Sequence, residues 1–330
     1  MRIKIFVLII LFALCITGCK TSPPLVYEET IEYGKVYVSS NIDSAKIFLD
    51  NSFTSKFTPD TITASVGGHI IKLEKENYAA QTFMVTVNKD SVQTVILTLQ
   101  QVSASKVVLL EDFANVSCTP CVTSNQIIEQ LVHTTYGVNK LVAVKFPTNF
   151  PSPNDPFFNA NMQDANSRIN YYKVFSAPSI FIDGIEKPSA TDSISIKEKI
   201  DARLEQTTVF GLKVNKNIAG SNLDVEVIVT PLDASIMTEN LVLQVVVIES
   251  KIEFAVPPGS NGETIFYNVM RRMLPNNGGT SLAQINLMAA NNFNFQTILN
   301  SAWQSSEINV VVFIQNVQTK EVLQAATTVQ

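Results

Sequence analysis

The hydrophobic pattern of this chain changes twice along its length, and each change limits the folds open to that part. Over residues 34–100, apolar and polar residues alternate in short segments between turn residues, which is typical of half-buried antiparallel strands. Over residues 105–205, continuous apolar runs and helical spacing alternate, the order of an α/β unit. From residue 207 long β patterns return. The pattern predicts a multidomain α+β protein in which an α/β domain lies between two antiparallel β-sandwiches.

The elements of the central and C-terminal parts can be placed from the same pattern. In the centre we expect buried strands at 106–113, 141–146 and 179–183 and helices at 122–135 and 193–204. In the C-terminal part we expect strands at 212–217, 223–230, 241–250, 264–273, 308–316 and 321–328. These elements predict domains at 34–102, 103–206 and 207–330.

The first residues carry a processing signal rather than a part of the fold. A short positive region precedes an apolar run at 5–16 that is too short to span a bilayer, and Ile16-Thr17-Gly18-Cys19 follows. This tetrapeptide resembles the bacterial lipobox, in which the cysteine receives a diacylglycerol and becomes the new N-terminus. The resemblance implies a lipoprotein signal peptide at 1–18, and the polar composition of 19–33 indicates a tether. The alternative is an ordinary secretory signal that contains a cysteine by chance.

Lipidation of Cys19 would determine where the protein works. Several acyl chains on one cysteine, palmitate among them, hold a protein stably, whereas one chain alone binds only marginally. The lipid bilayer is therefore an expected partner, and the expected location is the cell envelope. Lys20 stands where lipoproteins retained at the inner membrane of enteric bacteria carry aspartate, which favours the outer membrane. The periplasmic face and the surface face both stay open.

Charge and composition argue against several classes of function. The net charge is −5, and no cluster of lysine and arginine marks a nucleic-acid partner. The two histidines, His69 and His133, lack the neighbouring residues of a metal site or a Ser-His-Asp triad, so we expect neither metal nor cofactor. Once the signal peptide is removed and Cys19 is lipidated, Cys118 and Cys121 are the thiols that remain. They are spaced C-x-x-C in a compartment where disulfides persist.

The N-terminal β segment resembles a PEGA domain. Its opening strand at 34–40 is followed by Ser44-Ala45-Lys46-Ile47-Phe48-Leu49-Asp50, by the turn Thr58-Pro59, and by Gly68-His69-Ile70-Ile71-Lys72-Leu73 leading to Tyr78. The namesake tetrapeptide of the family is replaced by Thr58-Pro59-Asp60-Thr61. The resemblance implies a small β-sandwich that serves as a spacer or binding module at the cell envelope and carries no chemistry.

The segment Asp112-Phe113-Ala114-Asn115-Val116-Ser117-Cys118-Thr119-Pro120-Cys121 is where chemistry is expected. It resembles the thioredoxin active-site segment, in which a strand ending in Asp-Phe is followed by Trp-Cys-Gly-Pro-Cys, although Ser117 and Thr119 replace the usual tryptophan and glycine. Ala177-Pro178, just before a predicted strand, corresponds to the cis-proline of that family. The resemblance implies a thioredoxin-like domain whose site residues are Cys118, Cys121, Asp112 and Pro178.

Helix electrostatics support a reactive first cysteine. Cys118 would stand at the start of the helix, where the helix N-terminus stabilises a thiolate. Cys121, one turn further, would be the shielded, resolving thiol, and the resemblance implies that Asp112 takes its proton. A cis Pro178 would present backbone groups to a bound peptide. The alternatives are a closed structural disulfide, a solvated carboxylate at Asp112 and an ordinary trans bond at Pro178, whereas zinc would need a second pair of ligands.

Residues 105–330 together resemble outer-membrane-protein-28-like lipoproteins. Leu109-Leu110-Glu111-Asp112-Phe113 is similar to the Leu-Leu-Glu-Glu-Phe-Thr-Gly opening of that family, with Ala114-Asn115 in place of Thr-Gly. Segments of the second half look similar as well, at 247–249, 267–275, 312–316 and 320–325. In that family a thioredoxin-like half is followed by a β-sandwich half, so the resemblance informs fold more than activity.

Two functions from different classes follow from these features. In the first, the protein is a thiol–disulfide oxidoreductase that exchanges with envelope proteins carrying thiols or disulfides, with Cys118 attacking and Cys121 resolving. In the second, it is a non-catalytic binding lipoprotein, or a subunit of an envelope assembly, with a structural Cys118–Cys121 disulfide. The proline-rich stretch 147–165 either lies over the Cys118 face and selects partners or packs at the domain edge.

Overall fold

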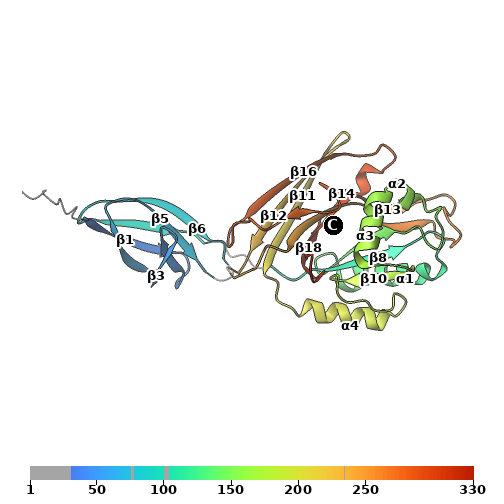
Figure 1. Cartoon of the computed structure of the whole chain (residues 1–330), viewed down its shortest axis with the longest axis horizontal. Coiled ribbons are helices and arrows are strands. Elements are labelled where there is room, and N and C mark those ends of the chain that lie inside the picture. The colour runs from blue at the N-terminus through green and yellow to red at the C-terminus, as the bar shows by residue number, and fades with distance from the viewer. Residues whose placement is uncertain (1–30, 76–77, 100–103, 234) are drawn as a thin grey trace, which may run out of the picture.

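The computed structural model describes residues 31–75, 78–99, 104–233 and 235–330, and it consists mostly of β-sheet organised in several domains (Figure 1). The predicted signal peptide and Cys19 lie outside the described residues. In Figure 1 a small β domain, drawn in blue, occupies one end of the molecule, and a larger body occupies the other. Of the helices described, none has the length and apolar character needed to cross a membrane.

The N-terminal domain is a sandwich of two sheets, as the alternating pattern predicts. One sheet has the strand order β4-β1-β7 and the other β3-β2-β5-β6. Its strands are β1 (Tyr33–Ser40), β2 (Lys46–Leu49), β3 (Ser52–Phe57), β4 (Asp60–Ser65), β5 (Gly67–Glu74), β6 (Gln81–Val87) and β7 (Val92–Leu97). Alternate side chains of β1 are buried, so Val36 and Val38 meet Ile47 and Ile71 from the facing sheet. The domain thus has an apolar core of its own.

The central segment contains the predicted strands and helices in their predicted order, together with two helices between the second and third strands that were not predicted. It comprises β8 (Val108–Ala114), α1 (Thr119–Glu129), the π-helix η1 (Gln130–Tyr136), β9 (Leu141–Pro147), α2 (Pro156–Ala160), α3 (Met162–Tyr172), β10 (Ser179–Ile182) and α4 (Ser193–Leu204). Strands β8 and β9 are parallel, and β10 pairs antiparallel with the other edge of β8. Every residue of β8 and β9 is buried, because side chains pack against both faces.

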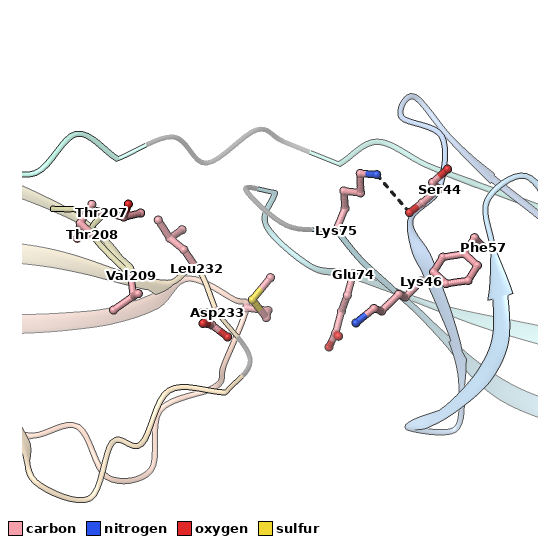
Figure 2. Close-up of a pocket in the computed structure, with 11 residues that line it drawn as sticks. Ser44, Lys46, Phe57, Glu74, Lys75, Thr207, Thr208, Val209, Leu232 and Asp233 are labelled. Carbon is pink, nitrogen blue, oxygen red and sulfur yellow. Dashed lines mark hydrogen bonds between the residues drawn. The ribbon is translucent and has the colours of Figure 1, made fainter. Parts of the chain in front are cut away.

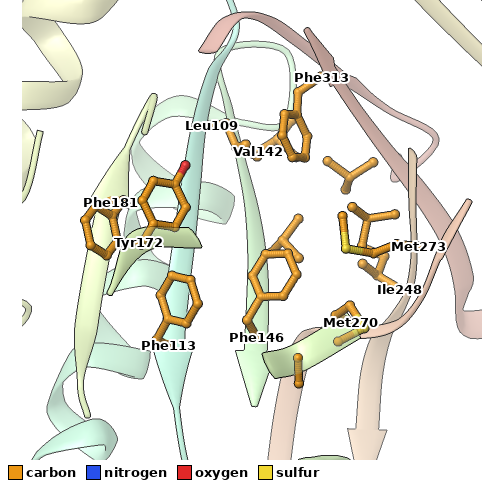
Figure 3. Close-up of a cluster of buried hydrophobic side chains, with 14 of the residues drawn as sticks. Leu109, Phe113, Val142, Phe146, Tyr172, Phe181, Ile248, Met270, Met273 and Phe313 are labelled. Carbon is orange, nitrogen blue, oxygen red and sulfur yellow. The ribbon is translucent and has the colours of Figure 1, made fainter. Parts of the chain in front are cut away.

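The two faces of β8 meet different partners. Val108 and Leu110 point to the side covered by α1 and α4, where Ile128 and Ile200 complete the contact. Phe113 points to the opposite side, into a cluster with Phe146 of β9, Tyr172 of α3 and Phe313 of the C-terminal part (Figure 3). Asp112 and Ala114 therefore lie on the α1 face of the strand, since side chains alternate along it.

The C-terminal part shares a sheet with the central segment. Its strands are β11 (Phe210–Ala219), β12 (Asn222–Pro231), β13 (Leu241–Glu253), β14 (Ile265–Leu274), β15 (Thr280–Ser281), β16 (Asn291–Ile298), β17 (Ile308–Asn316) and β18 (Val322–Thr327). Strand β14 pairs in parallel with β9, which gives the order β10-β8-β9-β14-β13-β17-β18. The boundary that we expected at residue 206 therefore does not separate two independent sheets. The physical reason is that β8 pairs with only one edge of β9, and without β14 the backbone N–H and C=O groups of the other edge would stay unpaired.

A second, three-stranded sheet completes the predicted C-terminal sandwich. It has the order β11-β12-β16 and packs over the face of β13 and β17 that carries Val245, Val247 and Val312. Strand β16 was not expected from the sequence. Its residues do alternate, with Phe293 turned toward the core, but its asparagines and glutamine have low strand propensity and obscured the pattern.

A buried polar network fastens the central segment to the C-terminal strands. Arg168 of α3 donates from Nε to Glu111 Oε1 of β8 at 3.0 Å and from Nη1 to Gln315 Oε1 of β17 at 3.1 Å. Tyr172 donates its hydroxyl to Glu111 and accepts from Gln315 Nε2 at 2.9 Å. All four side chains are buried, so each depends on the others for its hydrogen bonds.

Candidate functional site

The predicted cysteine pair lies at the junction of β8 and α1. Cys118 and Cys121 form a disulfide, with Cys118 as the residue that precedes the first turn of α1 and Cys121 inside that turn. Cys118 has an extended backbone, and Pro120 occupies the first turn, where its missing N–H has no helical acceptor to lose. The local geometry is thus the one that places the first sulfur near the positive end of a helix.

Both cysteines are buried, which differs from the exposed first thiol that a reactive pair suggests. Cys118 is 1 % exposed and Cys121 is 0 % exposed. The disulfide packs with Ala114 at the end of β8 and with Ala177 before β10. In the structure as it stands, a protein partner cannot reach either sulfur.

Pro178 lies beside this group. The Ala177–Pro178 peptide bond is cis, and the pairing of Ser179 with Phe113 brings both residues to the end of β8. Ala177 packs against the disulfide, while Pro178 is half-buried. The structure therefore gathers Asp112, Cys118, Cys121 and Pro178 at the carboxyl end of one strand.

Asp112 is buried on the α1 face of β8, two residues before the alanine that touches the disulfide. It is 1 % exposed, so it is not the solvated strand-end carboxylate considered above. Its Oδ2 accepts a hydrogen bond from Lys145 Nζ, and the same ammonium group donates to Asn125 Oδ1 of α1. Among the described atoms, Oδ1 of Asp112 has no hydrogen-bond partner. The ion pair with Lys145 therefore engages one oxygen of the Asp112 carboxylate and leaves the other without a hydrogen bond.

Lys145 is a site residue that the sequence analysis missed. It pairs directly with Asp112 in the β8–β9 register and is only 8 % exposed. A signal was present, because it is the one charged residue in the otherwise apolar strand Leu141–Pro147. A buried lysine needs a counter-charge, and the strand pairing that supplies it is not visible in the sequence.

Glu129 extends the charged group along α1. Burial raises the pKa of Glu129 to about 7, while the Lys145 ammonium lowers it and the Asp112 carboxylate raises it further. Glu129 Oε2 lies 3.0 Å from His133 Nε2 on the next turn, without the geometry of a hydrogen bond. Glu129 is therefore a carboxyl group close to the Asp112–Lys145 pair that titrates near neutral pH.

The loop between β13 and β14, residues 254–264, is called the β13–β14 loop below. It lies against residues 112–121, the candidate active-site segment. Asn261 N donates to Val116 O at 3.2 Å, and Ser260 N donates to Ser117 Oγ at 3.3 Å. Glu263 accepts from Asn125 Nδ2 at 2.7 Å. A part of the chain remote in sequence thus covers the residues around Cys118.

The proline-rich insertion, residues 147–165, contacts both Val116 and the base of the β13–β14 loop. Asp155 Oδ2 accepts the backbone N–H of Val116 at 2.9 Å, and its other oxygen accepts the first N–H groups of α2. Phe157 of α2 packs on Phe254 and Phe266 at the base of the β13–β14 loop. The insertion is therefore part of the site's framework, and the cover itself comes from the C-terminal part.

A cavity of about 500 Å³ lies at a different place, between the N-terminal domain and the C-terminal part. Figure 2 shows the residues that line it. Lys46, Glu74 and Lys75 approach it from one side and Thr208 and Asp233 from the other. These are separate polar groups rather than a nucleophile with its base, and the predicted site residues lie elsewhere. In the part of the chain that the structure describes, no three His, Cys, Asp or Glu residues gather as metal ligands.

Comparison with protein-family models gives two matches. The model of the outer membrane protein Omp28 matches residues 165–330, and the model of the PEGA domain matches residues 33–103. Together they agree with the two resemblances to named families stated from the sequence. No curated protein matches the chain.

Among solved structures, HBP35 of Porphyromonas gingivalis matches with a TM-score of 0.59 and 15% identity, over 68% of this chain and 75% of that one. This is a likeness of fold. AGR_C_4864 from Agrobacterium tumefaciens gives a TM-score of 0.45 at 10% identity, over 69% and 98% of the two chains. A domain of the outer membrane lipoprotein Omp28 from Porphyromonas gingivalis gives 0.28 at 15% identity, over 36% and 86%.

Proposed function

Because the chain belongs to the Omp28 outer membrane protein family, we propose that it acts at the outer membrane as a thiol–disulfide exchange protein with Cys118 and Cys121 as its redox pair. The family confirms the outer membrane localisation expected from the sequence, and the N-terminal match confirms the PEGA domain. The exchange activity, its envelope partners and the lipid on Cys19 are parts of the proposal.

We further propose that residues 103–206 form a thioredoxin-like unit. The parallel pair β8–β9 connected through α1, the antiparallel β10 after α3, and the closing helix α4 support this assignment. The strand order β9-β8-β10 puts the disulfide at the end of the central strand of the three. The pairing of β14 with β9 then adds C-terminal strands to the edge of this unit and leaves the unit itself intact.

The single observation that carries the proposal is the position of the disulfide. It begins at the N-terminus of α1 and packs on Ala114, two residues from the buried Asp112–Lys145 pair. The helix end stabilises a Cys118 thiolate, and the free oxygen of Asp112 can hold the proton of Cys121. Lys145 acts as a positioning residue, since it fixes the Asp112 carboxylate through an ion pair.

Exchange proceeds in two displacement steps. A thiolate of a partner dithiol attacks Cys118 Sγ, the bond to Cys121 breaks, and Cys121 leaves with the electron pair as a thiolate that takes up a proton from solvent. The second partner thiolate then attacks the partner's own sulfur in the mixed disulfide and releases Cys118. Two electrons pass from the partner to the cysteine pair, and a second envelope disulfide restores the pair. The same steps in reverse reduce a partner disulfide. In the opposite direction the Asp112 carboxylate accepts the proton of Cys121.

A trapping experiment tests this function. In the full-length Cys121→Ala variant, a mixed disulfide on Cys118 cannot be resolved, so envelope proteins accumulate in covalent complexes that reductant releases. The matched Cys118→Ala variant should trap far less, because Cys121 is the inner thiol. If neither variant traps a partner and the reduction potential of the pair lies far below about −270 mV, exchange is ruled out as the function.

One observation favours the second function, a binding or assembly lipoprotein with a structural disulfide. Both sulfurs are buried, as in a bond that only braces the start of α1. Alkylation of the reduced protein near pH 6 separates the two functions. A structural pair predicts that Cys118 reacts no faster than a free cysteine, whereas exchange predicts faster reaction at Cys118 than at Cys121.

A further inference from the structure

We propose that the β13–β14 loop is a lid that closes over the Cys118–Cys121 disulfide and must move away before a protein partner can reach Cys118. This inference rests on the proposed function of the same site and concerns its regulation. It explains why a cysteine at an exposed helix start, followed by the exposed residues Thr119 and Pro120, is itself 1 % exposed.

The tip of the lid is held by polar contacts with the active-site segment. Besides the backbone bond from Asn261 to Val116, the Asn261 side chain donates from Nδ2 to the Cys118 carbonyl at 3.5 Å. These contacts use the backbone of Val116 and Cys118. An extended segment of a partner can therefore take them over, because any peptide N–H can donate to the Val116 carbonyl.

Gly259 allows the lid to come this close. A Cβ atom built at this position would lie 2.2 Å from the carbonyl oxygen of Val116 and 2.5 Å from its carbonyl carbon. Both are backbone atoms, which cannot turn aside as a flexible side chain can. A side chain at 259 must therefore push the lid away from Val116, and its effect starts where the lid meets the active-site segment.

Glu263 connects the lid to Asn125 and, through Asn125, to the Asp112–Lys145 ion pair. Its two carboxylate oxygens accept separately, one from Asn261 Nδ2 at 2.6 Å and the other from Asn125 Nδ2 at 2.7 Å. Asn125 in turn accepts from Lys145, which holds Asp112. The lid thus connects through two side chains to the carboxylate that exchanges a proton with Cys121.

The base and the tip of the lid differ in how firmly they are held. At the base, Phe254 and Phe266 pack on Phe157 with ring centroids 5.8 and 5.0 Å away. Beyond the base, Val256 is already 72% exposed, and at the tip the contacts are hydrogen bonds from the exposed Ser260 and the half-buried Asn261. Opening the tip therefore uncovers little apolar surface of the lid, so the base can stay folded as a hinge.

The test compares how fast the disulfide is reduced in full-length variants. We expect Gly259→Ala to be reduced by a small dithiol protein at least about tenfold faster than the wild type, the effect of weakening lid closure by roughly 1.4 kcal/mol. Glu263→Gln should also accelerate reduction, because an amide has only one oxygen to accept with. The matched control is Gly68→Ala, a position with nothing within 4 Å, which should leave the rate unchanged.

Unfolding midpoints in urea, measured on the oxidised proteins, show whether a faster rate comes from the lid or from loss of the fold. Unchanged rates in both Gly259→Ala and Glu263→Gln would overturn the lid. So would acceleration that scales with a lowered midpoint. If reduction accelerates at an unchanged midpoint but Cys121→Ala still traps no partner with the lid variants, the lid stands and the exchange function fails.

Discussion

Asp112 and Lys145 stand directly opposite each other in the parallel β8–β9 pair, and their side chains form an ion pair between the sheet and α1. Both are almost fully buried, at 1 % and 8 % exposure. Asp112 lies two residues before Ala114, which packs on the disulfide, and Lys145 is connected to the lid through Asn125. Because each buried charge is balanced by the other, removing one of them alone should lower the stability of the fold.

Removal of Lys145 should leave Asp112 as an unpaired buried charge. We expect Lys145→Met to lower the free energy of unfolding at pH 7 by about 3–5 kcal/mol, measured by urea denaturation of the oxidised protein. The double variant Asp112→Asn/Lys145→Met should recover most of this loss, since neither charge remains. A double variant no more stable than Lys145→Met alone would show that the ion pair is not the cause.

Glu129 should make stability depend on pH. Its pKa is about 7 in the folded protein against 4.5 in the unfolded chain, so the folded state binds more protons between these values. The stability that the protonated Glu129 side chain contributes is fully present below pH 4.5 and is lost as pH rises through 7. Since the side chain is 22% exposed, we expect Glu129→Gln to be more stable than wild type by roughly 1–2 kcal/mol at pH 8 and equal at pH 4. Equal stabilities at pH 8 would contradict the raised pKa.

Arg168 should be more important for folding than any surface cation. Arg168→Met leaves Glu111 buried and unpaired and is expected to cost about 3–5 kcal/mol of unfolding free energy. The control is Lys197→Met, which breaks an exposed pair with Asp201 four residues away and should cost less than about 1 kcal/mol. Thermal unfolding of both variants gives the comparison. If both variants lose a similar amount of unfolding free energy, the buried network does not stabilise the contact between α3, β8 and β17.

Cys19 should be the residue that carries the lipid. In cells fed with labelled palmitate, Cys19→Ser is expected to lose the label completely, because the acyl chains have no other attachment in the mature chain. Cys15→Ser is the matched control and should keep full label, since Cys15 is removed with the signal peptide. Label that persists in Cys19→Ser would show that the tetrapeptide is not a lipobox.

Much of the local structure was predictable because it depends on residues close in sequence. The alternation in 34–40 predicted β1, and the apolar run before Asp112 predicted β8 to within two residues. The helical spacing after Cys121 predicted the helix, although its start at Thr119 depends on Cys118 and Pro120. The C-x-x-C spacing and Ala177-Pro178 likewise predicted residues that lie together, since Ala177 packs on the Cys118–Cys121 disulfide.

What the sequence determined by itself, then, is the set of elements, the family resemblances and the cysteine pair, since hydrophobic periodicity and short motifs act over a few residues. Tertiary structure alone decided that β9 pairs with β14, that Lys145 meets Asp112, and that residues 254–264 cover Cys118. Each of these joins segments far apart in the chain. Such contacts form only when strand pairing and packing bring the segments together, and no local pattern encodes which edges will meet.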